Sequence, residues 1–424
     1  MLQVLSSAWA LLLGVGLLML GNGLQGSLLG IRGDIEGYST FTMSFVMSAY
    51  FVGLMFGSWI APTMIRRVGH VRVFAALASL ISAVMILYPA LTSPVVWTLG
   101  RLIVGFCFSG VYVTAESWLN NAADNENRGK ALSLYVVVMT LGLVLAQAFL
   151  LIGDPADYLP FVIASILVSV SVAPILLSIS PTPAFDTAKR MSLGELFTIT
   201  PLGCVGMFLI GGVFSAMFGM SAVYATSAGL DLRQTSLFVA CFYVGTLLTQ
   251  YPLGWVSDRM DRRLLIIIVS GTAGLSALFG MMAGGAYTLL LISALVTGSM
   301  VNPLYSILLA HSNDYLDHDD MAAASGGLVF INGVGAAAGP LIIGWLMGDA
   351  ILGPKGFFLF IATLLGALVA FAIYRSTQRQ TLPVDETGAI AMMAPTASPV
   401  AVEWGQEYII ETELEEQENS EARA

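Results

Sequence analysis

Charged side chains are rare in this sequence, and their rarity excludes an ordinary soluble domain. Only 10% of the 424 residues are Asp, Glu, Lys or Arg, whereas about 25% is usual in soluble proteins. Hydrophobic residues make up 57% of the chain, and its mean hydropathy is +0.84. The composition therefore predicts an integral membrane protein.

Cysteine and histidine are also scarce, with three of each. Cys107, Cys204 and Cys241 lie inside apolar runs, where small thiols pack and disulfides are not expected. One loop gathers potential metal ligands, and we interpret it as a solvated acidic loop rather than a cation site. Its members are His311, Asp314, Asp317, His318, Asp319 and Asp320. We therefore expect no cofactor, no metal site and no enzymatic activity.

Long apolar segments are what the chain has in abundance. A helix needs roughly 20 apolar residues to cross a bilayer core of about 30 Å. The first segment lacks a basic leader and a clear cleavage site, so we interpret it as a span and not as a signal peptide. The predicted spans are 7–28, 41–62, 73–92, 95–118, 131–151, 160–179, 202–226, 234–254, 264–284, 287–309, 322–347 and 356–375. The expected fold class is an all-α membrane protein with twelve transmembrane helices, six in each half.

Polar segments divide the chain into four parts. We expect an N-terminal six-helix bundle at 1–179, a cytoplasmic linker at 180–201 and a C-terminal six-helix bundle at 202–375. A Ser-x-x-Glu pattern in the linker is typical of a short interfacial helix. Residues 376–424 carry ten acidic residues against two arginines. Such a composition predicts a disordered acidic cytoplasmic tail.

The positions of Lys and Arg predict the orientation, because cytoplasmic loops retain basic residues. With the N-terminus inside, twelve basic residues fall on the inner side and four on the outer side. The inner residues are Arg66, Arg67, Arg72, Arg128, Lys130, Lys189, Arg190, Arg259, Arg262, Arg263, Arg375 and Arg379. Both termini are therefore predicted to be cytoplasmic.

The two halves are related in sequence. A shift of 192 residues lays 48–69 on 240–261 and aligns Val52-Gly53 with Val244-Gly245. The match falls at the second span of each half and the loop after it. It therefore indicates a parallel duplication of a six-helix unit.

The loop after the eighth predicted span carries a family resemblance. In GWVSDRMDRR (254–263), five residues match the Gly-x-x-x-Asp-Arg-x-Gly-Arg-Arg signature of the major facilitator superfamily, with Asp261 at the usual second glycine. TAESWLN (114–120), NRGKALSLY (127–135) and YPLGWVSDR (251–259) resemble its bacterial branch of uncharacterised and vitamin-type, including riboflavin-type, carriers. The resemblance implies two six-helix bundles around a central cavity in the bacterial inner membrane.

The same resemblance implies that this loop helps to close the cytoplasmic side when the cavity opens outward. Asp258 can pair with an arginine or a helix N-terminus, and contacts made in one conformation bias a two-state equilibrium. The alternative is a plain positive-inside anchor. The predicted gate residues are Arg66, Arg67, Gly69, Gly254, Asp258, Arg259, Arg262 and Arg263.

Two ionisable residues share one face of the fourth predicted span. Arg101 matches the superfamily's fourth-helix arginine, which the resemblance links to substrate binding or proton coupling. Glu116 is the candidate proton carrier, because ionisable groups at bilayer depth are costly and mark functional sites. The alternatives are that Arg101 extends to the outer headgroups and that Glu116 forms a boundary ion pair with Arg128 or with the arginines of the first-half loop.

Amides and aromatic rings complete the predicted cavity, although packing and interhelical hydrogen bonds are the alternative for each. Gly21-Asn22-Gly23 and Asn302-Pro303 are expected to loosen their helices and to free backbone groups. The predicted cavity residues are Asn22, Gln25, Arg101, Tyr112, Glu116, Gln147, Phe214, Phe218, Tyr243, Gln250, Asn302 and Tyr305. This mixture favours a neutral or weakly charged solute with a flat ring and hydroxyl groups.

We therefore predict a monomeric secondary transporter that works by alternating access within the lipid bilayer. Within the class of small-molecule solutes, we expect riboflavin or a similar vitamin. The sequence leaves open whether transport is coupled to protons, and we expect no nucleic-acid partner. Proton-coupled efflux of drugs or sugars is an alternative, although the fifth span lacks the Gly-Pro pair of drug antiporters. Two further hypotheses are a channel, and a membrane sensor or scaffold that acts through the acidic tail.

Overall fold

The computed structural model describes residues 2–122, 128–177, 191–348, 350–378, 383, 387, 388 and 390–407. Within these ranges the chain is helical and contains no strand. In the described part of the chain, twelve helices are long and apolar enough to cross a membrane. The protein is therefore a multi-pass membrane protein, and all twelve predicted spans are confirmed.

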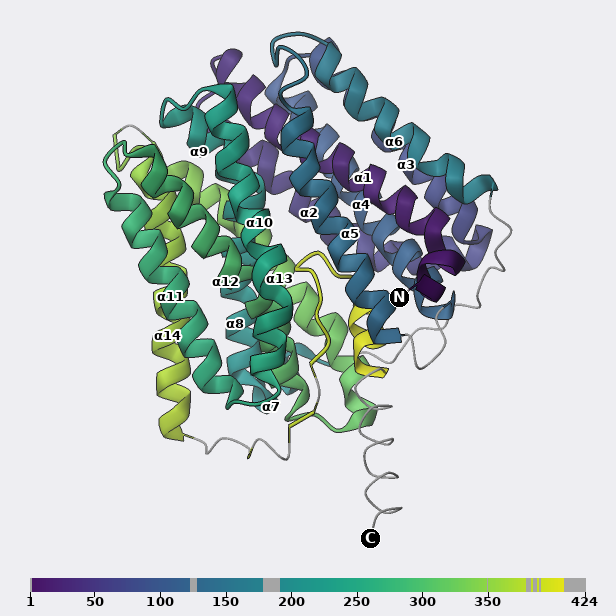
Figure 1. Ribbon diagram of the computed structural model, residues 1–424, viewed down its shortest axis with the longest axis vertical. Coiled ribbons are helices and arrows are strands. Elements are labelled where there is room, and N and C mark those ends of the chain that lie inside the picture. Colours follow the sequence, from purple (N-terminus) through teal and green to yellow (C-terminus); the bar gives the residue numbers. More distant parts are fainter. Residues whose placement is uncertain are drawn as a thin grey trace.

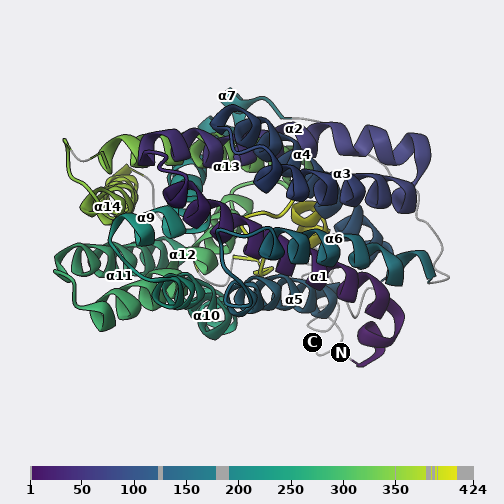
Figure 2. The same cartoon turned by 90° about the horizontal axis from the view of Figure 1, so that it is seen from above.

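The spans form two bundles that lie side by side in both views (Figures 1 and 2). The first bundle contains α1 (Leu2–Ile35), α2 (Thr40–Val68), α3 (His70–Ala90), α4 (Pro94–Ala122), α5 (Arg128–Phe149) and α6 (Leu159–Leu177). The second contains α8 (Pro201–Ser215), η2 (Ala216–Met220), α9 (Ser221–Ser227), α10 (Leu232–Ser257), α11 (Arg262–Met282), α12 (Tyr287–Asn313), α13 (His318–Leu346) and α14 (Lys355–Gln378).

Several helices extend beyond the apolar runs, because polar side chains cap their ends. Ser39 accepts a hydrogen bond from the backbone N–H of Thr42 and starts α2. Asp231 and Gln234 form a reciprocal capping box at the start of α10. Ser192 caps α7 (Leu193–Ile199), the short helix that the Ser-x-x-Glu pattern predicts. The rest of the predicted linker, up to residue 190, lies outside the described residues.

The seventh span is irregular at its centre, where the five residues of η2 form a π-helix between α8 and α9. Single π-helical turns often lie at functional sites. The expectation of loosened helix at Asn22 and Asn302 is wrong, because α1 and α12 are continuous there. The helical irregularity of the pocket region therefore lies in a segment that the sequence did not predict to be irregular.

Equivalent glycines pack the second and fourth helices of each half together. A methyl group on Gly105 of α4 would overlap a carbonyl oxygen of α2, and one on Gly53 would overlap a carbonyl of α4. Gly245 of α10 and Gly298 of α12 make the same close approaches in the second bundle. Gly53 and Gly245 are the pair that the 192-residue shift aligns. The sequence repeat therefore corresponds to a repeated helix contact.

The bundles touch directly at the end of the molecule where residues 36–39 connect α1 to α2, here called the opposite end. Ser48 donates to the carbonyl of Ala337 at 2.6 Å, and Thr40 donates to Gly344 at 3.4 Å. The other end, called the signature end, holds the loop between α10 and α11. There a third element separates the bundles.

That element is the tail segment, residues 390–407, which enters between the bundles from the signature end (Figure 1, yellow). Its last part is a helix over residues 399–407, and Val402 and Trp404 are fully buried. The expectation of disorder throughout 376–424 is therefore wrong for these residues. The uncharged run from Thr387 to Val402 supplies apolar surface, which the average composition of the tail had hidden.

Candidate functional site

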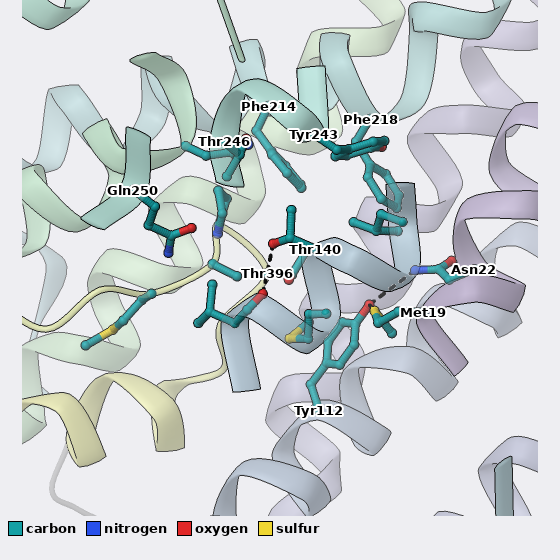
Figure 3. Close-up of a pocket in the computed structure, with 17 residues that line it drawn as sticks. Met19, Asn22, Tyr112, Thr140, Phe214, Phe218, Tyr243, Thr246, Gln250 and Thr396 are labelled. Atoms are coloured by element: carbon teal, nitrogen blue, oxygen red, sulfur yellow. Dashed lines mark hydrogen bonds between the residues drawn. The ribbon is translucent and has the colours of Figure 1, made fainter. Parts of the chain in front are cut away.

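A pocket lies between the two bundles, and helices of both bundles and the tail segment line it (Figure 3). It contains about 480 Å³ of empty space, including the part that opens to solvent. Its lining residues are Met19, Asn22, Tyr112, Val136, Met139, Thr140, Leu143, Phe214, Phe218, Tyr243, Thr246, Gln250, Asn302, Met393, Ala394, Pro395 and Thr396. No charged side chain lines the described pocket.

Stacked aromatic rings form one wall of the pocket. Phe218 of η2 stacks on Phe214, with ring centroids 5.5 Å apart, and on Tyr50 of α2, with centroids 5.8 Å apart. Tyr243 of α10 meets the edge of Phe218 at 6.5 Å. The stack joins the two bundles, and it offers flat apolar faces of the kind that hold ring-shaped ligands.

Amide groups lie on both sides of this wall. Asn22 donates to the hydroxyls of Tyr50 and Tyr112 at 3.0 and 3.2 Å, and Gln25 donates to Asn22 at 3.3 Å. These hydrogen bonds fix the orientation of the Asn22 amide.

On the second bundle, Asn302 donates to the hydroxyl of Thr246, but its Oδ1 atom has no partner among the described residues. Because an unpaired buried acceptor is costly, the Oδ1 atom of Asn302 is a natural contact for a solute donor.

The tail segment lines the side of the pocket that faces the signature end. Thr396 lies centrally among the labelled side chains, between Gln250 and Thr140 (Figure 3). Ser306 of α12 holds the backbone of Met393 twice, accepting from its N–H at 2.9 Å and donating to its carbonyl at 3.2 Å. The turn from Met393 to Thr396 is thus anchored where it meets the pocket.

Arg101 is fully buried but does not line the pocket. Its guanidinium lies over the ring of Tyr50, with Cζ 4.4 Å from the ring centroid. None of its three nitrogens has a hydrogen-bond partner among the described residues. The alternative that Arg101 extends to the outer headgroups is wrong, because the side chain is enclosed by protein. Tyr50 connects it to the pocket, because Tyr50 also contacts the lining residues Asn22 and Phe218.

Glu116 is also fully buried, near the signature end. Its carboxylate accepts from the Tyr135 hydroxyl at 3.2 Å, from the backbone N–H of Ser398 at 3.2 Å and from the Ser398 hydroxyl. These donors are all neutral. The alternative partner, Arg128, has a side chain outside the described part of the chain. The structure therefore attaches Glu116 to the tail segment.

The signature loop is held by its own bundle and by the tail. Asp261, the departure from the family pattern, caps α11 by accepting from the backbone N–H of Arg263 at 2.8 Å. Arg262 is buried and pairs with Asp314 of α12. Arg263 donates to the Tyr315 hydroxyl at 3.1 Å.

Two loop residues also bind the tail. Asp258 accepts from the backbone N–H of Ile390 at 3.0 Å, and Arg262 donates to the carbonyl of Gly388. Burial raises the pKa of the Asp258 carboxyl, and the Ile390 N–H and then Arg262 oppose that rise.

The remaining predicted gate residues are placed as follows. Arg259 is exposed and stacks over Trp255 at 4.3 Å. Arg66 and Arg67 lie exposed in the last turn of α2. Gly69 joins α2 to α3 at a φ of 84°. Gly254 packs against Met392 of the tail segment. A role for this set as a gate stays a prediction.

Seven of the twelve predicted cavity residues line the pocket: Asn22, Tyr112, Phe214, Phe218, Tyr243, Gln250 and Asn302. Gln25, Arg101, Glu116, Gln147 and Tyr305 do not. Gln147 accepts from Ser27 at 3.1 Å, and its carbonyl accepts from Ser236 across the bundle contact. Tyr305 is buried in α12. Solute binding by any of these residues stays a prediction.

Sequence reasoning missed several residues of the site. Thr246 lies between Tyr243 and Gln250 on α10, so helical spacing could have found it. Met19 and Met139 carried no signal beyond apolarity. Tyr50 lies in an apolar span, and its sequence context does not mark it as functional. Its contacts with Arg101 and Phe218 became visible only in the structure.

Comparison with known proteins decides the family. A sequence model described as Major Facilitator Superfamily matches residues 202–406, and one described as Sugar (and other) transporter matches residues 23–191. The chain belongs to the major facilitator superfamily. The family, the twelve spans and the two-bundle fold agree, and the protein is a membrane transporter of this superfamily.

Superfamily members of known sequence and structure resemble the chain at low identity. An uncharacterized MFS-type transporter YcaD of Escherichia fergusonii is 24% identical over 317 residues, which cover 74% of this chain and 81% of that protein. The YcaD protein of Salmonella heidelberg is 24% identical over 312 residues, covering 73% and 80%.

Among solved structures, a mutant of the nucleoside transporter NupG is similar with a TM-score of 0.73 and 16% identity, covering 86% of this chain and 99% of that one. FucP in the outward conformation gives a TM-score of 0.56 and 15% identity, covering 86% and 98%.

Proposed function

We propose that this transporter moves a small, neutral or weakly charged organic solute across the bacterial inner membrane by alternating access. The observation that carries the proposal is a pocket shared by both bundles and lined, among the described residues, by no charged side chain. A solute in this position contacts both halves, so that movement of one half against the other changes the side from which it is reached.

The lining favours a solute with a planar ring and hydrogen-bond donors. The Phe214 and Phe218 faces suit a flat ring, and the unpaired Oδ1 atom of Asn302 suits an N–H or O–H group. Riboflavin-type vitamins have both features, and so do nucleosides, the solutes named for NupG. We propose these two classes as substrates, and nucleosides are the first compounds to test.

The state described here is proposed to face the cytoplasm. The direct contacts at Thr40 and Ser48 close the opposite end, and the basic residues of the predicted inner loops favour a cytoplasmic position for the signature end. Glu116, which only neutral donors contact, is the proposed proton site if transport is coupled to protons.

A thermal-shift screen tests the solute class, since a ligand at 100 times its Kd stabilises the native state by about 2.7 kcal/mol. Uridine, adenosine, riboflavin and fucose are compared on the purified full chain and on its Trp404→Ala variant, which should loosen the tail segment because Trp404 is fully buried. A compound that raises Tm is then tested for saturable counterflow in liposomes.

Phe218→Ala should abolish the shift, whereas Phe208→Ala, an exposed phenylalanine of α8, should not. Conductance without saturation would indicate a channel. If no compound of either proposed class stabilises either protein, the proposed substrate class is wrong.

A further inference from the structure

The tail segment binds to both bundles at once. Toward the first bundle, Ser398 donates its backbone N–H and its hydroxyl to Glu116 of α4. Toward the second bundle, Gln406 donates to Asn313 at 3.1 Å and to the carbonyl of Met321 at 3.0 Å. Asp258 and Ser306 hold its first part. The segment therefore bridges the two bundles at the signature end.

The local sequence of the segment suits this shape. Ala397 donates to the carbonyl of Ala394 and closes a turn around Pro395 and Thr396. Ser398 precedes Pro399, and proline is favoured in the first turn of a helix. The helix over 399–407 follows, and its Trp404 is fully buried. The turn reverses the direction of the chain between the bundles, and the proline then starts the helix that leads out of this space.

The turn also occupies the route between the pocket and the signature end. Met393, Ala394, Pro395 and Thr396 are themselves lining residues of the pocket. Met393, Ala397 and Trp404 are buried, so the segment packs closely against the helices around it. A solute in the pocket would meet the tail before it met solvent at this end.

We propose that the tail segment, residues 390–407, forms a tethered plug, which blocks the signature-end access to the pocket and holds the bundles apart there. The signature loop is part of the docking surface, because Asp258 binds the start of the plug and Arg262 binds Gly388 just before it. Release of the plug precedes solute exchange and precedes any approach of the two bundles at this end. The carrier is thus autoinhibited by its own C-terminal segment. This inference goes beyond the proposed function, and it holds for any solute.

Alkylation of a pocket cysteine tests the plug without any solute. Cys107, Cys204 and Cys241 are replaced by alanine in the full chain, and Gln250→Cys supplies the reporter on the pocket wall. A water-soluble maleimide reacts with the purified protein in nanodiscs. The combined variant Ser398→Ala/Trp404→Ala should react about tenfold faster than its parent, which corresponds to a loss of about 1.4 kcal/mol in docking.

Two controls separate release of the plug from general loosening. Trp345→Ala removes an exposed tryptophan of α13 and should leave the reporter rate unchanged. Glu195→Cys, an exposed reporter on α7, should react equally in all variants. Equal reporter rates in the parent and in the combined variant would overturn the proposal.

A cross-link provides a second test that needs no destabilised variant. In the cysteine-free full chain, Ser306→Cys with Met393→Cys should form a disulfide under mild oxidation, because Ser306 holds the Met393 backbone. Ser306→Cys with Met392→Cys is the matched pair and should react more slowly, because Met392 packs on Gly254 instead. Failure of the first pair to react faster than the second would also overturn the proposal. Failure of the solute screen alone would leave it standing.

Discussion

Ser398 gives both of its hydrogen-bond donors to the carboxylate of Glu116, one from the backbone at 3.2 Å and one from the hydroxyl. The two residues are 282 positions apart in sequence. The contact connects the proposed proton site to the plug, so that the charge on Glu116 and the position of the tail depend on each other.

Glu116→Gln should loosen the plug, because an amide has one acceptor oxygen where the carboxyl group has two, and Tyr135 and Ser398 donate to different oxygens of Glu116. A hydrogen bond contributes about 0.5–1.5 kcal/mol, so we expect alkylation of the Gln250→Cys reporter to rise severalfold, up to about tenfold. Tyr135→Phe, which removes the third donor but keeps both Ser398 contacts, should change the rate less. A rate for Glu116→Gln equal to that of the parent would contradict the contact.

Docking of the plug should weaken as pH rises from about 4.5 to about 7. Burial, and then repulsion by Glu407, raises the pKa of Glu403 from 4.5 to about 7 in the docked tail. The docked state therefore binds the proton more tightly, and its advantage is complete below 4.5 and lost as pH rises through 7. The measurement is the reporter rate as a function of pH, corrected for the reactivity of free thiol.

Glu116, Asp258 and Glu407 are further carboxyl groups at this surface, so the matched variant Glu403→Gln isolates the effect of Glu403. It should dock more tightly than the parent at pH 8 and should lose part of the pH dependence. A pH profile unchanged by Glu403→Gln would show that Glu403 does not control docking.

Arg101→Met should raise the thermal stability while weakening solute binding. A buried charge without a hydrogen-bonded partner costs several kcal/mol, and the guanidinium of Arg101 lies over the Tyr50 ring with no hydrogen-bond partner among the described residues. Through Tyr50 it positions Asn22 and Phe218 at the pocket. Tm and the Kd of a solute identified by the screen are the two measurements. A lower Tm with unchanged Kd would assign Arg101 a purely structural role.

Arg262→Met should destabilise the protein strongly, because it breaks the buried ion pair between Arg262 and Asp314. The expected loss is about 3–5 kcal/mol, whereas Arg262→Met combined with Asp314→Leu should restore much of it. Thermal unfolding of the two single variants and the double variant gives the coupling. Additive losses in the double variant would show that the pair contributes little.

Asp258→Ala should impair transport and leave folding and insertion largely intact, since Asp258 is partly exposed and 3.8 Å from Arg262. Its contact with Ile390 predicts faster alkylation of the pocket reporter as well. Normal uptake by this variant would argue against a role of Asp258 in the gate.

The spans were predictable because each needs only a run of apolar residues of sufficient length, a local property. The face shared by Phe214 and Phe218 was predictable for the same reason, since helical spacing places both side chains together. The surroundings of the Arg101 side chain were not predictable. Its sequence position indicates bilayer depth, but which ring lies beside it depends on the packing of α2 against α4.

The tail segment shows most clearly what local sequence patterns do not predict. Its acidic residues dominate its composition, so the sequence favoured disorder, yet the uncharged stretch before Glu403 folds into the space between the bundles. Whether an isolated apolar stretch becomes ordered depends on a surface supplied by residues far away in sequence, here Glu116, Ser306 and Asn313.

The sequence by itself determined the membrane location, the number of spans, the duplicated halves and the signature loop, because hydropathy, helix length and motif spacing act over short stretches of chain. Only the tertiary structure decided which side chains meet in the pocket, that the guanidinium of Arg101 packs on the ring of Tyr50, and that the tail binds Glu116. Those outcomes depend on how two bundles and a terminal segment pack together, and no local pattern in the sequence specifies that arrangement.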